Sequence, residues 1–259
     1  MQKLVFGLVV CTVWFLTQGS AMAASGTAMG VDPQAEARAK AETRLLVVGS
    51  DIFIGDRVVT GASGQVQIKF DDRTELVVGP NSSLLIEDYL LREDGSAGKL
   101  ALSALAGTFR FVTGGAPKDR YLIKTPTGTI GVRGTAFELY VTALRHFVLQ
   151  LHGSTINCNE RGDKCFILNA MCELGEVSAD DAVVIGDTDD VTGAERARLR
   201  QMFIYAVSQR PLLREFRVDR AERCLNKPPS GGGADSLSDP GVFVPPDNIS
   251  YNMKLGLEP

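Results

Sequence analysis

The sequence comprises 259 residues, of which 44% are hydrophobic and 22% are charged, an ordinary composition for a folded globular protein. The formal net charge is −4 and the sequence isoelectric point is about 5.3, values that argue against a general affinity for nucleic acid. Nucleic acid is therefore not expected among the partners of this chain.

Residues 1–23 have the order of a secretory signal peptide. Lys3 precedes an apolar run from Leu4 to Leu16, and the small residues of Ala21-Met22-Ala23 follow. The apolar run is shorter than the ~20 residues that span a bilayer, and this order predicts cleavage after Ala23. We therefore expect a protein of the periplasm or a secreted protein, without a transmembrane anchor once the signal peptide is removed.

Residues 24–43 are small, polar and rich in alanine, and they predict a leader that is flexible or forms a short helix. Residues 44–152 change to short apolar runs separated by turn residues. One run, QVQIKF, alternates so that Val66, Ile68 and Phe70 share one face of a strand. Strands of this length and spacing predict a mainly β fold, either a sandwich or a short solenoid. Helices do not alternate with the strands, which argues against a Rossmann or P-loop architecture.

The rest of the chain divides into three parts by composition. Residues 153–185 predict a cysteine-containing β extension, and residues 186–225 predict a small helical segment. Residues 226–259 are rich in proline, glycine and serine, which predicts a disordered tail.

The predicted helical segment has a clear start and many arginines. Thr192 and Glu195 have the spacing of a capping box, and Pro211 ends the first helix or begins the next, which is expected to continue through PLLREFRVDRAERCL. Eight arginines occur in the segment, at positions 196, 198, 200, 210, 214, 217, 220 and 223. We favour a solvated helix face packed on the β-domain, and a basic face that binds a partner is the alternative.

The stretch KTPTGTIGVRGTAF, from Lys124 to Phe137, has the glycines of a phosphate-binding loop without its context. A Walker loop or a dinucleotide fingerprint opens a helix, whereas this stretch continues into AFELYV, which alternates as a strand. A nucleophile elbow needs Ser, Cys or Asp at a strand-to-helix turn, and the stretch offers none. The glycines therefore predict structural corners, since glycine allows positive φ and close backbone approach. Arg133 is expected to tie several backbone carbonyls or a carboxylate together with its five donors.

Several segments together resemble the FecR domain, the periplasmic sensor domain named after the ferric-citrate regulator. The resemblance covers roughly Val48 to Val141. Its most specific residues are Gly55-Asp56, Thr60, Phe70-Asp71-Asp72, Gly79-Pro80-Asn81-Ser82, Gly107, and Thr125-Pro126 with Gly131-Val132-Arg133-Gly134-Thr135. Arg73 departs from the family, which usually has glycine at this turn.

The resemblance implies a β fold and a periplasmic recognition or sensing role. It also implies that the family motif is structural or binds a partner; the motif residues are Thr125, Pro126, Gly131, Arg133, Gly134 and Thr135. FecR regulators carry a cytoplasmic sigma-factor-binding segment and a membrane helix before this domain, whereas a predicted signal peptide precedes it here. The predicted helices do not match the small C-terminal domain of those regulators. Sigma-factor control by this chain alone is therefore not implied.

Four cysteines remain after the predicted signal peptide: Cys158, Cys165, Cys172 and Cys224. An even number in an oxidising compartment favours disulfides, and the six-residue gaps are wider than those of paired zinc ligands. CNERGDKC has the pattern of a hairpin, which favours a Cys158–Cys165 bridge across paired strand ends. Cys172 would then pair with Cys224 and tie the helical segment to the β-domain, although sequence alone leaves the connectivity open.

Residues suited to catalysis are few. His146 and His152 are the only histidines, and we expect them at surface or edge positions ~20 Å apart along one strand. Paired carboxylates such as Asp71 and Asp72 would be the only candidates for catalysis, and neighbours on a strand point to opposite faces. The run GDTDD at 186–190 lacks the length of a calcium loop and predicts a solvated turn before the helix. No catalytic residue, metal site or cofactor is expected.

We therefore expect an exported non-catalytic protein for envelope recognition, sensing or assembly, with an unknown protein or an envelope glycan as its partner. One alternative is a periplasmic component of cell-surface signalling that acts with a separate sigma-factor regulator. Another is an enzyme acting on envelope polysaccharide. Binding is expected at strand edges or loops, above all the turns at 71–73 and 93–98. Replacing Asp71 and Asp72 with Asn is expected to leave folding intact.

Overall fold

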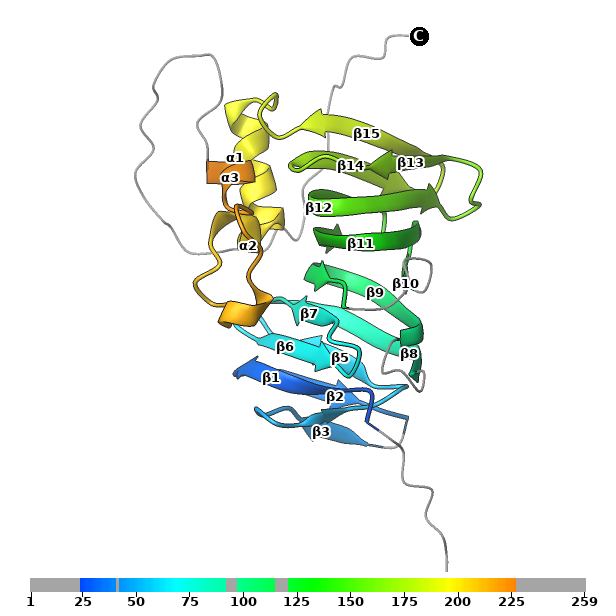
Figure 1. Cartoon of the computed structure of the whole chain (residues 1–259), viewed down its shortest axis with the longest axis vertical. Coiled ribbons are helices and arrows are strands. Elements are labelled where there is room, and N and C mark those ends of the chain that lie inside the picture. Colours follow the sequence, from blue (N-terminus) through cyan, green and yellow to red (C-terminus); the bar gives the residue numbers. More distant parts are fainter. Residues whose placement is uncertain (1–23, 41, 92–96, 115–120, 227–259) are drawn as a thin grey trace, which may run out of the picture.

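The computed structural model describes residues 24–40, 42–91, 97–114 and 121–226, so the predicted signal peptide and nearly all of the predicted tail lie outside the described residues. Most of the described chain is β-strand, as the sequence predicts, and short helices follow the last strand (Figure 1). No helix in these ranges is long and apolar enough to cross a membrane.

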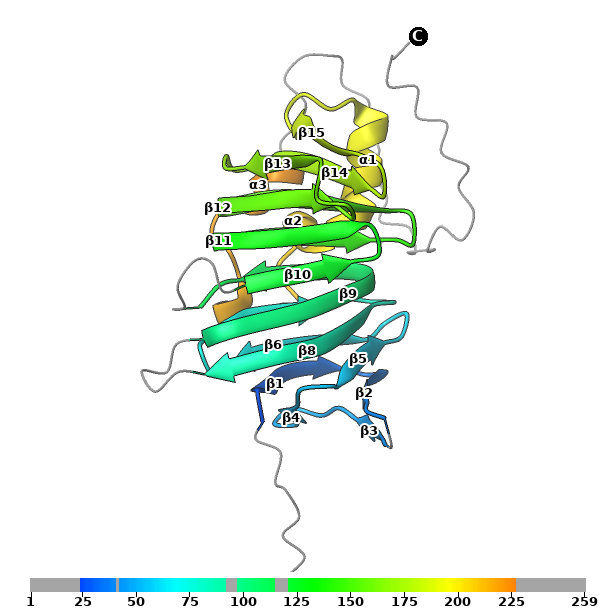
Figure 2. The ribbon, with the colours of Figure 1, turned by 90° about the vertical axis from the view of Figure 1, so that its right-hand side faces the viewer.

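The strands form one hydrogen-bonded sheet that folds over on itself into two layers (Figures 1 and 2). The first layer has the order β4-β1-β6-β7-β9-β11-β12-β14-β15, and the second has the order β3-β2-β5-β8-β9-β10-β11-β12-β13. The strands are β1 Gly26–Asp32, β2 Ala35–Arg38, β3 Thr43–Leu45, β4 Asp51–Ile52, β5 Arg57–Thr60, β6 Gln65–Phe70, β7 Glu75–Val78, β8 Ser83–Leu91, β9 Ala97–Val112, β10 Tyr121–Thr125, β11 Gly128–Val141, β12 Arg145–Asn159, β13 Cys165–Leu168, β14 Glu173–Ser178 and β15 Ala182–Asp187.

Three long strands belong to both layers. The first part of β9 pairs with β8 and β10, and its last part pairs with β7 and β11. β11 and β12 change partners in the same way. Each strand changes layer beside a glycine with positive φ: Gly107 (104°), Gly134 (58°) or Gly153 (70°). A residue with a side chain rarely adopts such a conformation, so glycine marks the corners of the fold.

The main hydrophobic core lies between the two layers. It is built from the alternate residues of each strand that point inward, among them Phe70, Phe109, Phe111, Phe137 and Leu139. The rings of Phe111 and Phe137 lie 5.6 Å apart. Burial of such side chains stabilises a fold by about 2–3 kcal/mol each relative to exposure, so this core holds the layers together.

The prediction of a flexible or helical leader was wrong. Residues 26–32 form β1, which pairs with β6, and residues 35–38 form β2, which pairs with β5. Ala28, Ala35 and Ala37 are buried in the core. The low hydrophobicity of these small side chains concealed the strands in the sequence.

The helical segment contains α1 Gly193–Met202, α2 Ile204–Val207, the 3₁₀ turn η1 Arg214–Phe216 and α3 Arg223–Asn226. Thr192 and Glu195 form the predicted capping box. The expected second helix through residues 211–225 is not present, because the chain there forms a hairpin: the Gln209 amide donates to Val218 O (3.0 Å) and the Val218 N–H donates to Gln209 Oε1 (2.8 Å).

The helical segment covers the outer face of the first layer, on the left in Figure 1. Leu199, Met202 and Phe203 pack against Phe147 and Leu149 of β12. Polar contacts add to this packing: Thr108 Oγ1 donates to Met202 O (3.1 Å), and the Leu213 N–H donates to Gln67 Oε1 (2.7 Å). The sheet therefore has one face covered by the chain's own C-terminal part.

Candidate functional site

The glycine-rich family motif lies at a corner of the fold. Thr135, just after Gly134, exchanges two backbone-linked hydrogen bonds with Thr113: its N–H donates to Thr113 Oγ1 (2.8 Å) and its carbonyl accepts from the Thr113 N–H (3.0 Å). A Cβ on Gly153 would lie 2.1 Å from Gly134 O, so the two corners touch backbone to backbone. This geometry fits the predicted role of the glycines as structural corners.

A row of buried polar side chains continues from this corner. The Gln150 amide donates to Thr135 Oγ1 (2.5 Å), Thr155 Oγ1 donates to Gln150 Oε1 (2.9 Å), and the Asn157 amide donates to Thr155 Oγ1 (3.0 Å). All four side chains are buried. These bonds join the inward faces of β11 and β12 at their bend, while Asn157 Oδ1 has no hydrogen-bond partner among the described residues.

Arg133 does not make the tie that the sequence predicts. Its side chain is exposed, and within the described part of the chain it makes no hydrogen bond or ion pair. Gly134 turns the strand immediately after it, and the side chain points out of the corner. Replacing Arg133 with Ala therefore breaks no buried hydrogen bond of the side chain. We expect this substitution to change the free energy of unfolding little.

The Thr-Pro-Thr-Gly part of the motif contacts a histidine. His146 is buried, and its Nδ1 lies 2.9 Å from the hydroxyls of both Thr125 and Thr127. The prediction of a surface or edge position was therefore wrong for His146, whereas His152 is exposed. The two histidines do not share a face of β12, although their even spacing would place them on one face of a regular strand, because an irregular register between β11 and β12 beside Gly153 changes the alternation. Burial lowers the pKa of His146 to about 3.

The turn at 71–73 contains a buried carboxylate. Asp72 accepts hydrogen bonds from the Thr74 N–H (3.1 Å), the Thr74 hydroxyl (2.8 Å) and the Tyr121 hydroxyl (2.7 Å). These contacts argue against the expectation that Asp72 can become Asn without loss of stability, whereas the expectation stands for the exposed Asp71. Arg73 has φ 69°, which explains why the family favours glycine there. Residues 93–96 of the other expected binding turn lie outside the described residues.

A buried ion pair lies under the helical segment and was not predicted from the sequence. Arg110 Nη2 lies 2.5 Å from Glu138 Oε1, and both side chains are fully buried. Arg110 also donates to Gln209 Oε1, and its guanidinium lies 5.7 Å from the Tyr205 ring centre. Burial raises the pKa of Glu138, while Arg110 opposes this shift. The pair fixes Gln209 and Tyr205 above the sheet and offers no access to a substrate.

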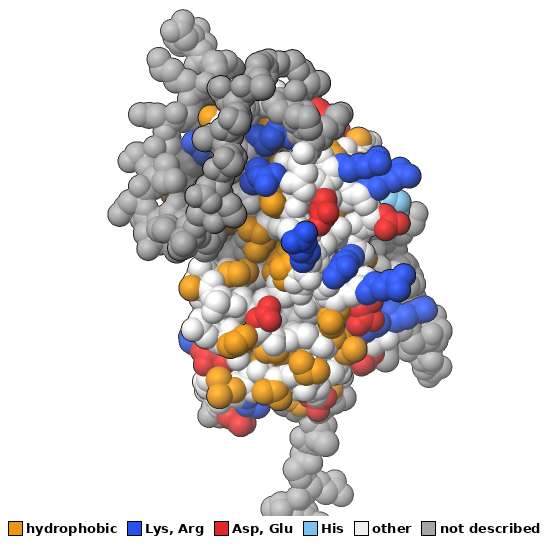
Figure 3. Space-filling view, turned by 90° about the vertical axis from the view of Figure 1, so that its left-hand side faces the viewer, with side chains coloured by type: hydrophobic (Ala, Val, Ile, Leu, Met, Phe, Trp, Pro, Cys, Tyr) orange, Lys and Arg blue, Asp and Glu red, His pale blue; other side chains and the backbone are white. Residues whose placement is uncertain are grey.

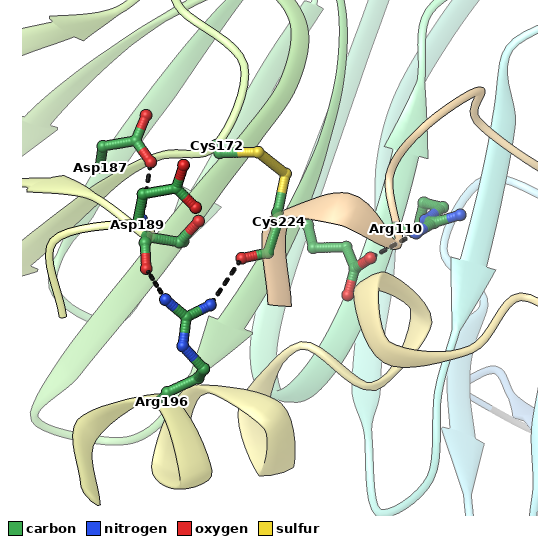
Figure 4. The surroundings of a disulfide bond; sticks show 8 residues. Arg110, Cys172, Asp187, Asp189, Arg196 and Cys224 are labelled. Atoms are coloured by element: carbon green, nitrogen blue, oxygen red, sulfur yellow. Dashed lines mark hydrogen bonds and ion pairs between the residues drawn. A yellow bond between two sulfur atoms is a disulfide. The ribbon is translucent and has the colours of Figure 1, made fainter. Parts of the chain in front are cut away.

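The structure joins the cysteines in the two pairs that the sequence favours. Cys158 and Cys165 face each other across the β12–β13 hairpin, with Cα atoms 4.1 Å apart. Cys172 and Cys224 connect the sheet to α3, and Arg196 of α1 donates to Cys224 O (3.4 Å) and to Thr188 O (2.6 Å) (Figure 4). The second bridge therefore fastens the end of the helical segment to the β-domain.

The clearest exposed apolar surface lies at the N-terminal end of the domain. Leu45, Val47 and Val48 are 79%, 63% and 66% exposed. We call these three residues the tip; Leu45 ends β3 and the two valines follow it, at the end of the molecule farthest from β15 (Figures 1 and 2). Exposed valine or leucine is ordinary when isolated, but three within four positions form a patch of the kind used for contacts between proteins.

The tip is held rigidly. Ser50 Oγ accepts from the Val47 N–H (3.0 Å), and the Ser50 N–H donates to Val47 O (3.0 Å), which closes a tight turn. Gly49 has φ 89° and donates its N–H to Ala28 O (2.8 Å). The buried Leu46 anchors the turn from below. The exposed valines are thus presented by a turn tied to β1.

The family residues Gly55-Asp56 brace the tip from the side. The buried Asp56 carboxylate accepts from Arg44 Nη2 (2.6 Å) and from the Phe53 N–H (2.9 Å). The Arg44 guanidinium lies 5.1 Å from the Phe53 ring centre. Because Arg44 precedes Leu45, this bridge fixes the strand that carries the tip.

Free strand edges flank the tip. β3 pairs only with β2, and β4 pairs only with β1, so each is the edge of its layer. An edge strand offers unpaired N–H and C=O groups to another chain. Sequence reasoning named strand edges in general and missed this one. The signal for it was LLVVG, four consecutive apolar residues before a turn, which an alternating strand cannot bury on one face.

The groups that catalysis would need are not brought together. In the described ranges no three His, Cys, Asp or Glu side chains are placed to hold a metal ion. Gly186 and Asp187 end β15, and residues 188–190 form a turn before α1 in which Thr188 is buried and the Asp189 N–H donates to Asp187 Oδ1 (2.8 Å). His146 lies in the interior against two threonines, and Asp72 is enclosed by Thr74 and Tyr121.

Comparison with known proteins gives one family. Residues 56–154 match the family described as FecR protein. No curated protein matches the sequence. Among solved structures, two crystal structures of a protein from Parabacteroides distasonis ATCC 8503, provisionally described as an anti-sigma factor, are similar at 10% and 12% identity, with TM-scores of 0.41 and 0.40. The matches cover 51% and 57% of this chain, and 59% and 74% of those chains.

Proposed function

We propose that this chain, whose residues 56–154 are a FecR domain, is an exported, non-catalytic recognition protein that binds another envelope protein through its tip. The observation that carries the proposal is the rigid turn that presents Leu45, Val47 and Val48 beside two free strand edges. Apolar side chains held in one conformation bind at low entropic cost, because little ordering remains to be done on association.

Two further features support an exported binding protein. Disulfides persist in oxidising compartments, and the two bridges join all four cysteines that follow the predicted signal peptide. The polar groups of the interior are hydrogen-bonded mostly to one another, as in the row from Thr135 to Asn157, so the inside serves the fold. The surface is then the part available for function.

Site-specific photo-crosslinking tests this proposal. A photoreactive residue at Val48 is expected to trap one envelope protein in living cells, and Val47→Asp in the same chain is expected to abolish the product. Leu144 is the matched control, since it is 75% exposed on the β11–β12 turn, away from the tip. Equal products from both positions would show that the tip has no special role.

A role in cell-surface signalling is the second candidate, and the FecR match favours it. In this version the protein bound by the tip is a separate regulator of a sigma factor. Deleting the gene would then change transcription from a sigma-factor-dependent promoter, and the Val47→Asp chain would fail to restore it. Turnover of an envelope polysaccharide by the purified protein would instead favour an enzyme.

A further inference from the structure

The second half of the helical segment has an unusual set of charges. We call residues 208–226 the strap; its arginines 210, 214, 217, 220 and 223 are all exposed. Residues 193–226 contain eight arginines and no lysine. Arginine differs from lysine in its planar fork of donors, which matches the oxygens of phosphate and carboxylate groups.

The strap has three acidic residues, Glu215, Asp219 and Glu222, so its five arginines leave a net charge of +2. Glu215 pairs with Lys69 of β6 at 2.8 Å, Glu222 accepts from the Gln209 N–H at 2.7 Å, and Asp219 is exposed. Arg210 and Arg214 make no ion pair with any residue in the described ranges. In a chain with a net charge of −4, positive charge is thus gathered on this one surface. Figure 3 shows Lys and Arg side chains spread over the face that carries the helical segment.

The strap holds the arginines in place. The Arg217 guanidinium donates to Leu212 O (2.9 Å) and Arg210 O (3.4 Å), which brings residues 210 and 217 side by side. One end of the strap is fastened by the Cys172–Cys224 bridge. Its turn is fastened by the bond from the Leu213 N–H to Gln67, so the exposed side chains project from a fixed backbone.

Apolar side chains lie between the arginines. In the sequence Arg210-Pro-Leu-Leu-Arg214, Leu212 is buried whereas Pro211 is exposed and Leu213 is 40% exposed. A leucine between two arginines suits the boundary of a lipid bilayer, where the leucine enters the acyl region and the arginines meet headgroup phosphates. An acidic protein surface would not require the exposed leucine.

We propose that the strap is a docking surface for an anionic phospholipid membrane, with Arg210, Arg214 and Leu213 at its centre. Arg217, Arg220 and Arg223 extend the positive surface along the strap. The tip lies on a different part of the molecule, near β3, so a protein partner and a membrane can be bound together. The inference does not depend on the identity of that partner.

Vesicle co-sedimentation tests the inference. The intact protein is expected to sediment with phosphatidylglycerol vesicles and to stay in solution with phosphatidylcholine vesicles. Binding should weaken strongly between ~0.05 M and ~0.5 M salt, since screening removes the attraction. Arg210→Ala/Arg214→Ala should lose about fivefold in affinity per arginine removed. Neither side chain makes an ion pair in the described ranges, so this variant is expected to fold, which a thermal melt will verify.

Arg38→Ala/Arg57→Ala is the matched control, because it removes two exposed arginines on the paired strands β2 and β5, which belong to the other layer. It is expected to bind the anionic vesicles as the unchanged protein does. Equal binding to phosphatidylcholine, or an equal loss in both double variants, would overturn the proposal. Binding to heparin without binding to phosphatidylglycerol vesicles would overturn it in favour of an acidic polysaccharide.

Discussion

His146 is a titratable group placed among threonines, and its burial affects how the protein responds to acid. An ordinary histidine has a pKa near 6.5, whereas burial lowers that of His146 to about 3. Between these values the unfolded chain binds a proton that the folded chain does not. The free energy of unfolding therefore falls as the pH falls through this window, and it is unaffected by this group above it.

The free energy of unfolding is expected to fall by about 2 kcal/mol between pH 6.5 and pH 5, because a proton bound only by the unfolded chain costs ~1.4 kcal/mol per pH unit. His146→Gln should be less stable at pH 7 and should lose this part of the pH dependence. Urea unfolding at several pH values measures both effects. His152→Gln is the control, because His152 is exposed and should keep the slope of the unchanged protein. An unchanged slope in His146→Gln would mean that other groups cause the acid sensitivity.

Asp72 gives a second test at the same scale. Its carboxylate accepts from two hydroxyls and one backbone N–H, and Asn would turn an amide N–H₂ toward some of these donors. We expect Asp72→Asn to lower the free energy of unfolding by about 2–3 kcal/mol. The neighbouring Asp71→Asn should stay within about 0.5 kcal/mol, because Asp71 is exposed. Denaturant unfolding of the two variants side by side measures both losses. Equal losses would contradict the prediction that Asp72 contributes more to stability than Asp71.

At the scale of strands and helices, sequence patterns predicted those elements that follow a simple period. QVQIKF became β6, the CNERGDKC hairpin formed, and the capping box began α1. The pattern failed for β1 and β2, whose inward residues are alanines and glycines. It failed also for the strap, where helical spacing of apolar residues occurs in a hairpin held by Gln209 and the sheet.

Among the site residues, too, the sequence predicted local features and missed those that depend on how strands pair. The glycines of the family motif could be placed at corners from their chemistry alone, since positive φ is a local property. Arg133 could not be placed, because its direction depends on the side to which the corner turns. His146 and His152 came to lie on different faces through a change of register at Gly153, a feature of how β12 pairs with β11 rather than of the strand itself.

The contact between two corners can be measured with glycine variants. Gly153 and Gly162 have nearly equal φ values, 70° and 71°. A Cβ at Gly153 would meet Gly134 O, whereas nothing lies within 4 Å of one at Gly162. Gly162→Ala is therefore expected to cost only the ~1–2 kcal/mol of the backbone conformation. Gly153→Ala should cost clearly more, because the corner must also move apart. Chemical unfolding gives the difference, and equal costs would show that the corner is loosely packed.

At the scale of the whole molecule, the two disulfides differ in how much chain they constrain. Cys158 and Cys165 are 7 residues apart in sequence, while Cys172 and Cys224 are 52 apart. Closing the longer loop removes more conformational entropy from the unfolded chain, by a difference of about 1.5–2 kcal/mol. We expect Cys172→Ser/Cys224→Ser to lower the melting temperature more than Cys158→Ser/Cys165→Ser.

Limited trypsin digestion adds a second measurement for this pair. Cleavage in the strap should become faster without the Cys172–Cys224 bridge and should stay unchanged without the other. A faster cut in both variants would indicate a general loss of stability instead of release of the strap.

The shared strands also bear on how the chain reaches this structure. β9, β11 and β12 each contribute to both layers, so neither layer can be completed before the other. The strap, which covers the sheet, lies near the end of the chain, and its Leu213 binds Gln67 across 146 residues. Contacts between such distant positions slow folding, because a long loop must close before they contribute. If the chain is exported as proposed, it emerges N-terminus first from a membrane channel. The face of β6 and β7 then stays uncovered until the strap has passed through, and a chaperone would find the most exposed apolar surface to bind during that interval.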